Sequence, residues 1–263
     1  MKWKISILGT RGSAPITGRD FEEYGGDTLC VAVECEDRLF VFDAGTGIRH
    51  LKCSGKETHI FISHYHQDHI LGLGKWPELL NPENRIILHL PDIRPGERGI
   101  DVLSSFFSPP FWPVGLHQYP AEVLLVTMGE TCDVGDLHIA GISGCHPDGV
   151  RFYRLYDEKR SFTYMVDCEL PEDSYVYEQF ARNSDLLIID GQMDETDLPM
   201  KKGWGHNTML QAGEFGKRCL AKKTILVHVD VDADDGMISE RRSRLQSYYP
   251  TADFGKQGEA IRL

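Results

Sequence analysis

The sequence predicts an α/β protein in which two packed β-sheets are flanked by helices, in one domain spanning residues 1–263. Three observations predict this fold class. Each half of the chain contains several short β-type runs followed by a helical stretch, and such elements bury their apolar faces by stacking in layers. A chain of 263 residues with 41% apolar and 26% charged residues can bury a large core. No linker-like or low-complexity segment divides it.

The first half of the chain is rich in β-type runs. Alternating or continuous apolar residues predict strands at residues 2–8, 28–34, 38–42, 59–62 and 86–90. A glycine-rich loop, Gly9 to Ser13, follows the first strand, and Glu36-Asp37 predicts a hairpin between the second and third. A helix is predicted over 99–107. It ends at Ser108-Pro109-Pro110-Phe111-Trp112-Pro113, which no regular element accommodates.

The second half continues with strands and ends with helices. Further β-type runs predict strands at residues 123–126, 137–142, 152–156, 162–166, 186–189 and 224–227. Apolar residues at helical spacing between Met209 and Leu220 predict a helix packed on a core. A polar helix is expected over about 235–246. The two halves therefore resemble each other in layout, which is the basis for two layered sheets.

The charge balance excludes broad binding to polyanions. The net charge is −12 and the pI is near 5.3, so the protein has no general attraction to nucleic-acid phosphates or anionic lipid. A local positive site could still bind an anion. Small molecules are therefore the expected substrates.

Cysteine use and the N-terminus predict a cytoplasmic protein. The chain has seven scattered cysteines and no C-x-x-C pair, a pattern that fits reduced thiols better than a disulfide framework. After Met1 the only apolar run is Ile5 to Leu8, which is too short for the core of a signal peptide. No stretch approaches the length of a membrane span, so no membrane partner is expected.

The strongest local signal is a histidine cluster directly after an apolar strand. It reads His64-Tyr65-His66-Gln67-Asp68-His69. Imidazole and carboxylate groups together suit zinc and similar divalent ions. A chance histidine-rich surface loop is the alternative, but such loops rarely follow a buried strand and open a helix. The cluster therefore predicts a metal site.

This H-x-H-x-D-H pattern resembles the signature of the metallo-β-lactamase superfamily, whose fold is a four-layer αββα sandwich. The resemblance implies further ligands at later strand ends, and residues of the right type follow in order at His146, Asp167 and His228. It assigns His64, His66 and His146 to one metal, Asp68, His69 and His228 to a second, and Asp167 to a bridge between them. Asp43 matches the superfamily's supporting aspartate.

Taken singly, each later residue also has a structural interpretation. His146 could be a turn histidine, Asp167 a surface acid and His228 a core histidine. The remaining histidines match no motif and are expected to be structural; they are His50, His59, His89, His117 and His138.

The resemblance implies two divalent metal ions, and the chemistry follows from them. Zn²⁺ is expected, although the same ligands also bind Mn²⁺ or Fe. Ions about 3.5–4 Å apart can share a hydroxide as nucleophile and stabilise charge on the attacked group. Asp68 is expected to ligate a metal and orient this hydroxide. Asp43 is expected to steady the ligand loop.

Flanking motifs are similar to the phosphodiesterase branch, which includes ribonuclease Z and cyclic phosphodiesterases. These motifs include Leu8 to Ser13, Tyr24 to Thr28, Phe42 to Gly47 and Trp204-Gly205-His206-Asn207-Thr208. In that branch the histidine matching His206 contacts the phosphate and donates a proton to the leaving oxygen. A helix N-terminus capped by Asn207 or Thr208 is a compatible structural interpretation.

Within this branch a small, possibly cyclic, phosphodiester is the expected substrate. The tRNA-gripping arm of ribonuclease Z is inserted between the positions of His146 and Asp167, which here are only 21 positions apart. Together with the acidic charge, this disfavours tRNA. The flavo-diiron branch fits poorly, because it has an acidic residue at the position of Gln67.

Weaker expectations concern substrate contacts and assembly. Arg11, in the glycine-rich loop, is a candidate phosphate contact or a solvated loop arginine. Phe111 and Trp112 are candidates for stacking against the substrate or for packing under a loop. The acidic run from Asp230 to Asp235 predicts a helix-capping loop, with a second cation site as the alternative. Relatives are commonly dimers, so a homodimer is an expectation from the resemblance.

Two other functions remain open at this stage. The same metals could serve a hydrolase of carbonyl substrates, such as a thioester, lactone or β-lactam, which has less use for His206. A binding or accessory protein that keeps the fold without turnover is a third interpretation. Degenerate relatives usually lose ligands, whereas every expected ligand type is present in this sequence.

Overall fold

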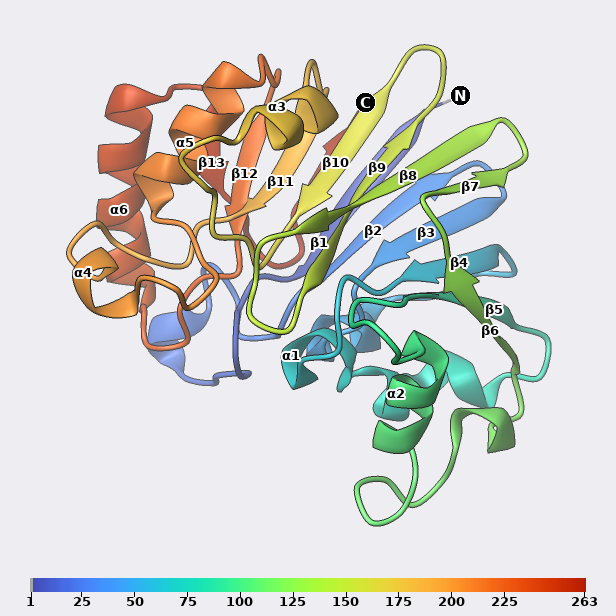
Figure 1. Ribbon diagram of the computed structural model, residues 1–263. Helices are drawn as coiled ribbons and strands as arrows, with labels where there is room; N and C mark the ends of the chain where they lie inside the picture. Colours follow the sequence, from blue (N-terminus) through green and yellow to red (C-terminus); the bar gives the residue numbers. More distant parts are fainter. Residues whose placement is uncertain (1) are drawn as a thin grey trace.

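The computed structural model describes residues 2–263 and consists of two seven-stranded β-sheets packed face to face, with helices on both outer surfaces (Figure 1). The first sheet has the strand order β14-β1-β2-β3-β4-β5-β6. Its strands are β1 (Trp3–Gly9), β2 (Cys30–Cys35), β3 (Arg38–Phe42), β4 (Glu57–Phe61), β5 (Arg85–Pro91), β6 (Glu122–Met128) and β14 (Ala260–Arg262). The second sheet has the order β13-β12-β11-β10-β9-β8-β7. Its strands are β7 (Thr131–Val134), β8 (Leu137–Gly144), β9 (Val150–Tyr156), β10 (Ser161–Met165), β11 (Leu186–Asp190), β12 (Thr224–Val227) and β13 (Ala252–Phe254).

Helices cover the outer face of each sheet. α1 (Gln67–Ile70) and α2 (Gly99–Phe106) lie on the side of the first sheet, and α3 (Tyr175–Ala181), α4 (Leu198–Lys201), α5 (Met209–Arg218) and α6 (Asp235–Tyr248) lie on the side of the second (Figure 1). Five short 3-10 helices occupy Arg19–Phe21, Thr46–His50, Leu73–Lys75, Pro77–Leu80 and Leu116–Gln118. The predicted four-layer αββα sandwich is therefore confirmed.

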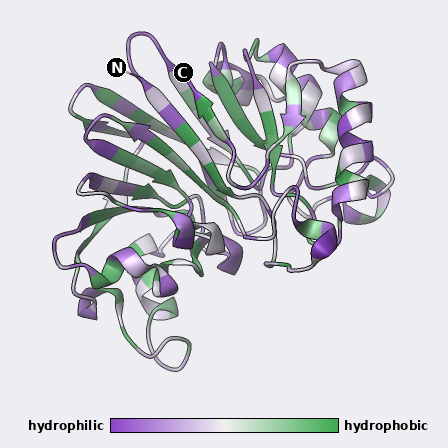
Figure 2. Cartoon of the chain, turned by 180° about the vertical axis from the view of Figure 1, so that it is seen from behind, coloured by the Kyte–Doolittle hydropathy of each residue, from purple (hydrophilic) through white to green (hydrophobic). Residues whose placement is uncertain are grey.

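Three apolar clusters hold these layers together. The central one lies between the sheets and includes Phe42, Phe61, Tyr153 and Tyr164, all fully buried. A second cluster joins the first sheet to its outer helices, and a third joins the second sheet to α5 and α6. Seen from behind, the strands are coloured mainly as hydrophobic and the connections mainly as hydrophilic (Figure 2). Burial of apolar surface on both faces of the strands explains why they are continuous apolar runs.

Parallel pairing brings the site together. β3, β4, β5 and β6 are parallel in the first sheet, and β10, β11, β12 and β13 are parallel in the second. The carboxyl ends of parallel strands meet at one edge of a sheet, where ligands bind in open α/β sheets. The residues following β3, β4, β10, β11 and β12 can therefore meet at one end of the sandwich.

All the predicted strands are present with small shifts at their ends, and the helices predicted near 99–107, 209–220 and 235–246 are confirmed. The sequence analysis missed β7, β13, β14, α3 and α4, which have three to seven residues each. Elements this short carry too few residues to show a periodic pattern. All seven cysteines are free thiols in the described residues. No helix in the described part of the chain is long and apolar enough to cross a membrane.

Candidate metal centre

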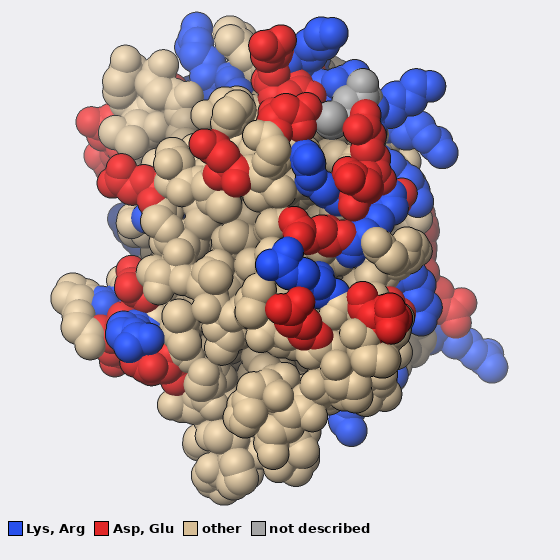
Figure 3. Space-filling model, turned by 90° about the vertical axis from the view of Figure 1, so that its right-hand side faces the viewer, with Lys and Arg blue, Asp and Glu red and all other residues tan. Residues whose placement is uncertain are grey.

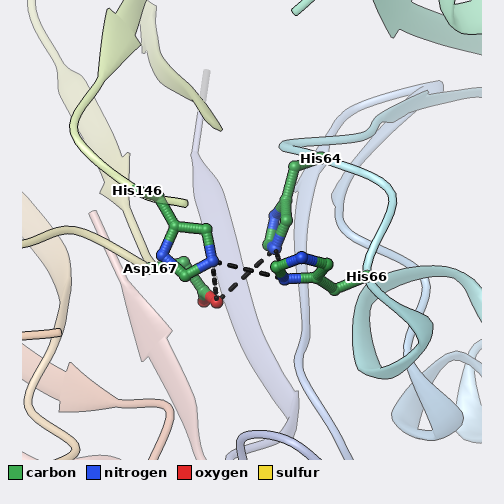
Figure 4. A group of neighbouring side chains, drawn as sticks. All are labelled: His64, His66, His146 and Asp167. Atoms are coloured by element: carbon green, nitrogen blue, oxygen red, sulfur yellow. Dashed lines mark hydrogen bonds and ion pairs between the residues drawn. The ribbon is translucent and has the colours of Figure 1, made fainter. Parts of the chain in front are cut away.

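The predicted ligands converge at the carboxyl ends of the strands in two adjoining groups. The first group is His64, His66, His146 and Asp167, which point toward one another from both sheets (Figure 4). Nε2 of His64 and Nε2 of His146 lie 2.9 Å and 3.2 Å from Nδ1 of His66. Both Nε2 atoms also lie 3.5 Å from Oδ2 of Asp167. Four donor atoms therefore surround one point.

The second group lies on the other side of Asp167. Nε2 of His69 and Nε2 of His228 lie 3.2 Å and 3.1 Å from Oδ2 of Asp68. The same two nitrogens lie 3.2 Å and 3.0 Å from Oδ1 of Asp167. One oxygen of Asp167 thus faces each group, which is the arrangement expected of a bridging carboxylate.

These groups fit a pair of divalent cations. Zinc–nitrogen distances of 2.0–2.1 Å place tetrahedral ligand atoms roughly 3.3 Å apart, and the separations in both groups lie close to this value. Nε2 of His69 and Oδ1 of Asp167 are buried without a hydrogen-bond partner among residues 2–263. Buried polar atoms are rarely left unpaired unless a ligand or ion satisfies them. The nitrogen and oxygen donors are those that zinc and similar metals take.

The electrostatics keep the carboxylates in their ligand form. Burial raises the pKa of Asp167, but the imidazoles of His228 and His69 outweigh burial and hold that pKa well below its usual value. The pKa of Asp68 is likewise lowered, because His69 and His228 offset the effect of burial. Both carboxyl groups are therefore ionised, as metal binding requires.

Asp43 fixes the ligand loop after β4 by hydrogen bonds. It follows β3, is fully buried, and its Oδ2 accepts hydrogen bonds from Nδ1 of His69 at 2.8 Å and from the hydroxyl of Tyr164 at 2.9 Å. The backbone N–H of Ser63 donates to Oδ1 at 2.7 Å, and its hydroxyl donates to Oδ2 at 2.8 Å. Because Nδ1 of His69 donates to Asp43, Nε2 is left as the lone-pair nitrogen facing the second group.

The rings of two other histidines are oriented in the same way, by oxygen atoms that contact their Nδ1 atoms. Nδ1 of His64 lies 3.0 Å from the hydroxyl of Ser63, and Nδ1 of His146 lies 3.1 Å from the carbonyl oxygen of Gly205. Gly205 has φ of 90°, and a Cβ there would lie 2.1 Å from Nδ1 of His146. Only glycine therefore lets this loop approach the ligand so closely.

Unusual backbone conformations direct three side chains toward the candidate metal centre. Asp43, Asp167 and His228, each following a strand, have φ of 59°, 49° and 60°. A left-handed conformation is uncommon for residues other than glycine and persists where the surroundings enforce it, often at functional sites. The glycine-rich loop contributes here too, because a Cβ on Gly12 would lie 2.4 Å from the ring of His228.

His206 lies beside the second group and pairs with Asp190. Nδ1 of His206 lies 2.7 Å from Oδ2 of Asp190, the last residue of β11. Its ring stacks on that of His228 at 5.0 Å. Thr208 caps α5, accepting a hydrogen bond from the N–H of Gln211, so the predicted capping role is confirmed for Thr208. Sequence reasoning missed Asp190, although it ends a strand as Asp43 and Asp167 do.

The structure places Arg11 in the interior of the protein, so the interpretation as a solvated loop arginine is wrong, and the phosphate contact stays a prediction. The Arg11 side chain is fully buried. Nε donates to the carbonyl of Gly25 at 2.7 Å, and Nη1 donates to the carbonyl of Ala233 at 2.6 Å and that of Asp230 at 3.2 Å. Arg11 therefore ties three loops together. The glycine-rich loop predicted its position but not that backbone carbonyls accept from Nε and Nη1.

The aromatic candidates also lie away from the cavity beside the centre. Phe111 is 72% exposed. Trp112 packs beside Gly74 and edge-on against Phe107, and its indole N–H donates to the hydroxyl of Tyr119 at 3.3 Å. The cavity next to the centre is lined by His64, Tyr65, His66, Ile93, Arg94, Glu97, Gly99, Val102, Asp148 and Gly149. The packing interpretation therefore holds for Trp112.

The acidic run after β12 serves as a capping loop. Asp234 accepts a hydrogen bond from the N–H of Met237 and caps α6. Asp230 pairs with Lys201 at 3.0 Å, and Asp235 accepts from the N–H of Glu23 at 2.8 Å. These contacts use the carboxylates within the protein, in agreement with the structural interpretation.

Comparison with known proteins agrees with this geometry. The sequence signature of the β-lactamase superfamily domain matches residues 38–229. The chain belongs to the metallo-β-lactamase superfamily. It is 23% identical to ribonuclease Z of Thermoplasma acidophilum over 98% of this chain and 97% of that protein. It is 24% identical to ribonuclease Z of Picrophilus torridus over 99% of each chain.

Solved structures show the same fold. The metallo-β-lactamase fold protein YhfI from Bacillus subtilis has a TM-score of 0.77 and 17% identity, covering 100% of both chains. A diphosphatase from the PhnP family has a TM-score of 0.74 and 19% identity, covering 100% of this chain and 98% of that one. The short form of human tRNase Z has a TM-score of 0.71 and 19% identity, covering 98% of each. These structures share the fold of this chain. Its family and its ribonuclease Z relatives make it a metal-dependent hydrolase, and its histidine and aspartate groups suit divalent ions.

Proposed function

We propose that the protein is a phosphodiesterase that acts on a small phosphodiester, cyclic or open. The two groups described above, with Asp167 belonging to both sides, would hold two divalent ions, Zn²⁺ by preference. When bound, the ions supply Lewis acidity that activates water at neutral pH and neutralises charge on the phosphoryl oxygens. His206 is proposed to act as the acid that protonates the leaving oxygen.

The observation that carries this proposal is the pairing of His206 with Asp190 at the edge of the second group. The 2.7 Å contact fixes the ring through Nδ1 and leaves Nε2 as its other donor. One ring nitrogen of His206 lies within 4.8 Å of donor atoms of Asp167 and His228. A carboxylate behind an imidazole fixes its tautomer and orientation. This geometry supports delivery of a proton from His206 to a poor leaving group.

Other side chains hold the reacting region in place. Oδ2 of Asp68 accepts the backbone N–H of Ser13 at 2.7 Å while facing His69 and His228. This hydrogen bond fixes the carboxylate beside the imidazoles, which suits it to orient an attacking water. Asp43 orients His69, and the Gly205 carbonyl orients His146. The chain thus supplies fixed ligand directions without reorganisation during the reaction.

A small substrate is favoured over tRNA by three features. Between His146 and Asp167 the chain forms only β9, β10 and the tight connection joining them. The protein carries a net charge of −12, and on the face seen in Figure 3 acidic and basic side chains are interspersed at the top and right while much of the rest is uncharged, so this face has no broad basic surface. The alignment with the Thermoplasma protein runs over 310 positions, so that relative has segments without a counterpart in these 263 residues.

The test is a leaving-group series on zinc- or manganese-loaded protein. Phosphodiesters with a 4-nitrophenolate leaving group need no proton, whereas those with an alkoxide leaving group do. His206→Ala is expected to lower kcat/KM only a few-fold for the former and about 10²- to 10⁴-fold for the latter. His138→Ala is the matched control, because His138 is a half-exposed histidine that pairs with Asp133 at a distant hairpin.

The outcomes separate the competing functions. No turnover of any diester by protein that holds two metals would overturn the proposal. Hydrolysis of thioesters or lactones that is unchanged in His206→Ala would favour an acyl hydrolase instead. Cleavage of a tRNA precursor with an efficiency above that of small diesters would overturn the small-substrate part and leave the phosphodiesterase part intact.

A further inference from the structure

The cavity beside the candidate metal centre has its own chemical character. His64 and His66 belong both to its lining and to the first donor group, so the cavity opens directly onto the centre. Its volume is about 170 Å³. Sites for drug-sized ligands usually measure about 300–1,000 Å³. The cavity therefore has room for one ring-sized group.

The walls of the cavity are apolar and preformed. Tyr65, Ile93 and Val102 line it from the loop after β4, the loop after β5 and helix α2. The hydroxyl of Tyr65 donates to the carbonyl of Pro91 at 2.7 Å, which fixes the ring. A Cβ on Gly99 would lie 1.9 Å from that hydroxyl, so glycine allows the close packing. The walls therefore present a fixed apolar surface next to the metal ligands.

The rim carries a net negative charge. Arg94 is the one lysine or arginine among the lining residues, and two carboxylates already face it. Its Nη2 lies 2.7 Å from Oδ1 of Asp148, and its Nη1 lies 3.6 Å from Oε2 of Glu97. Binding of a polynucleotide chain requires unpaired positive groups along its path. This rim does not offer them.

We propose that this cavity is a subsite for an uncharged, ring-sized group esterified to the substrate's phosphoryl group, and that it selects against an anionic group at that position. The inference rests on the proposed phosphodiesterase function and specifies its substrate class: diesters with one compact, planar, neutral substituent. Tyr65, Ile93 and Val102 contact the ring, and Glu97 and Asp148 supply the charge selection.

The first test compares two diesters with the same leaving group. Phenyl 4-nitrophenyl phosphate carries a ring for the cavity, and methyl 4-nitrophenyl phosphate does not. After correction for the rates without protein, kcat/KM is expected to favour the phenyl ester about 10- to 100-fold. Val102→Trp fills the cavity. It is expected to raise KM for the phenyl ester and so to bring the ratio of the two kcat/KM values close to 1. Ser105→Trp is the control, because Ser105 is exposed on the same helix and does not line the cavity.

A binding measurement makes the two proposals separable. The dissociation constants of phenylphosphonate and methylphosphonate are measured by calorimetry on zinc-loaded protein. Tighter binding of phenylphosphonate than of methylphosphonate, lost in Val102→Trp, supports the subsite. If the same protein hydrolyses no diester, only the proposed function fails. Diester turnover with equal kcat/KM for the two esters would overturn the subsite and leave the proposed function standing. Equal effects of Val102→Trp and Ser105→Trp would do the same.

The charge selection is tested with 4-carboxyphenylphosphonate. It is expected to bind about 3- to 10-fold more weakly than phenylphosphonate, because the rim is negative and partly screened by solvent. Glu97→Gln should narrow this difference. Asp101→Asn should not, since Asp101 pairs with Arg98 and does not line the cavity. Equal binding of the two phosphonates to the unmodified protein would contradict this part of the inference.

Discussion

The molecule contains two groups of buried histidines, one beyond the end of β4 and one within β4 and β5, and the partners of their ring nitrogens differ. His64 and His69 follow the end of β4, and Nε2 of each faces Asp167 of the second sheet. His59 and His89 lie within β4 and β5. Nδ1 of His59 lies 3.0 Å from Nε2 of His89, and Nε2 of His59 lies 3.0 Å from Oε1 of Glu57.

The difference lies in what surrounds the ring nitrogens. Nε2 of His69 faces Asp68 and Asp167 and has no hydrogen-bond partner in the described part of the chain. The rings of His59 and His89 instead stack on Phe40 and Phe61, with centroids 5.6 Å and 4.2 Å apart. Both groups are buried, so burial alone does not make a histidine a metal-ligand candidate. Its place beyond a strand end, beside a carboxylate that both donor groups share, does.

The largest effect is expected from Asp167, which both donor groups share. Asp167→Ala should remove a ligand from each metal and leave the buried imidazoles without their counter-charge. Both metals should be lost and diesterase activity should fall by more than about 100-fold. Elemental analysis and kinetics measure this. His89→Phe is the comparison variant and should retain the metal; equal metal loss in both variants would contradict the distinction between the two histidine groups.

A smaller effect is expected from the residue behind the ligands. Asp43→Asn keeps the shape of the side chain but removes the charge that orients His69 and accepts from Ser63. Metal affinity should fall about 10- to 100-fold, as for other outer partners of ligating histidines. Competition with a zinc chelator measures it. Asp133→Asn serves as control, because Asp133 is exposed and pairs only with His138 in the described structure; an unchanged affinity in Asp43→Asn would refute the supporting role.

The ligand groups could be predicted from sequence because each ligand is marked locally. The H-x-H-x-D-H cluster follows a strand, and Asp167 and His228 each end a strand that is recognisable from its apolar run. The strand ends could therefore be placed together by the general rule for parallel sheets, once the resemblance supplied the order of the ligands. The same local information explains why the fold class was predictable.

The parts that were not predictable depend on distant contacts. Arg11 is buried because backbone carbonyls from residues more than 200 positions away accept its donors. The contact between Asp190 and His206 forms only when β11 and α5 pack together. Tyr65 lines the cavity only because Gly99 lies close to its hydroxyl. No periodicity within the sequence carries this information, because it arises from tertiary packing.

The smallest expected effect concerns the His59–His89 pair and acid stability. Burial and the neighbouring His59 lower the pKa of His89 to about 3, whereas an unfolded chain has a histidine pKa of about 6.5. Below pH 6.5 the unfolded state therefore binds a proton that the folded state does not. The stability contributed by the neutral ring is complete above pH 6.5 and is lost as the pH falls toward 3, at no more than about 1.4 kcal/mol per pH unit.

His89→Phe should remove this dependence while keeping the stack on Phe61. Denaturant unfolding at pH 7 and pH 5, with chelator present so that metal does not contribute, should show that the wild type loses about 2 kcal/mol more than the variant over this range. The variant should also be less stable at pH 7, because Nδ1 of His59 loses its partner. Parallel losses in the two proteins would mean that His89 takes up its proton in the folded state, and the contrast with the ligand histidines would then rest on geometry alone.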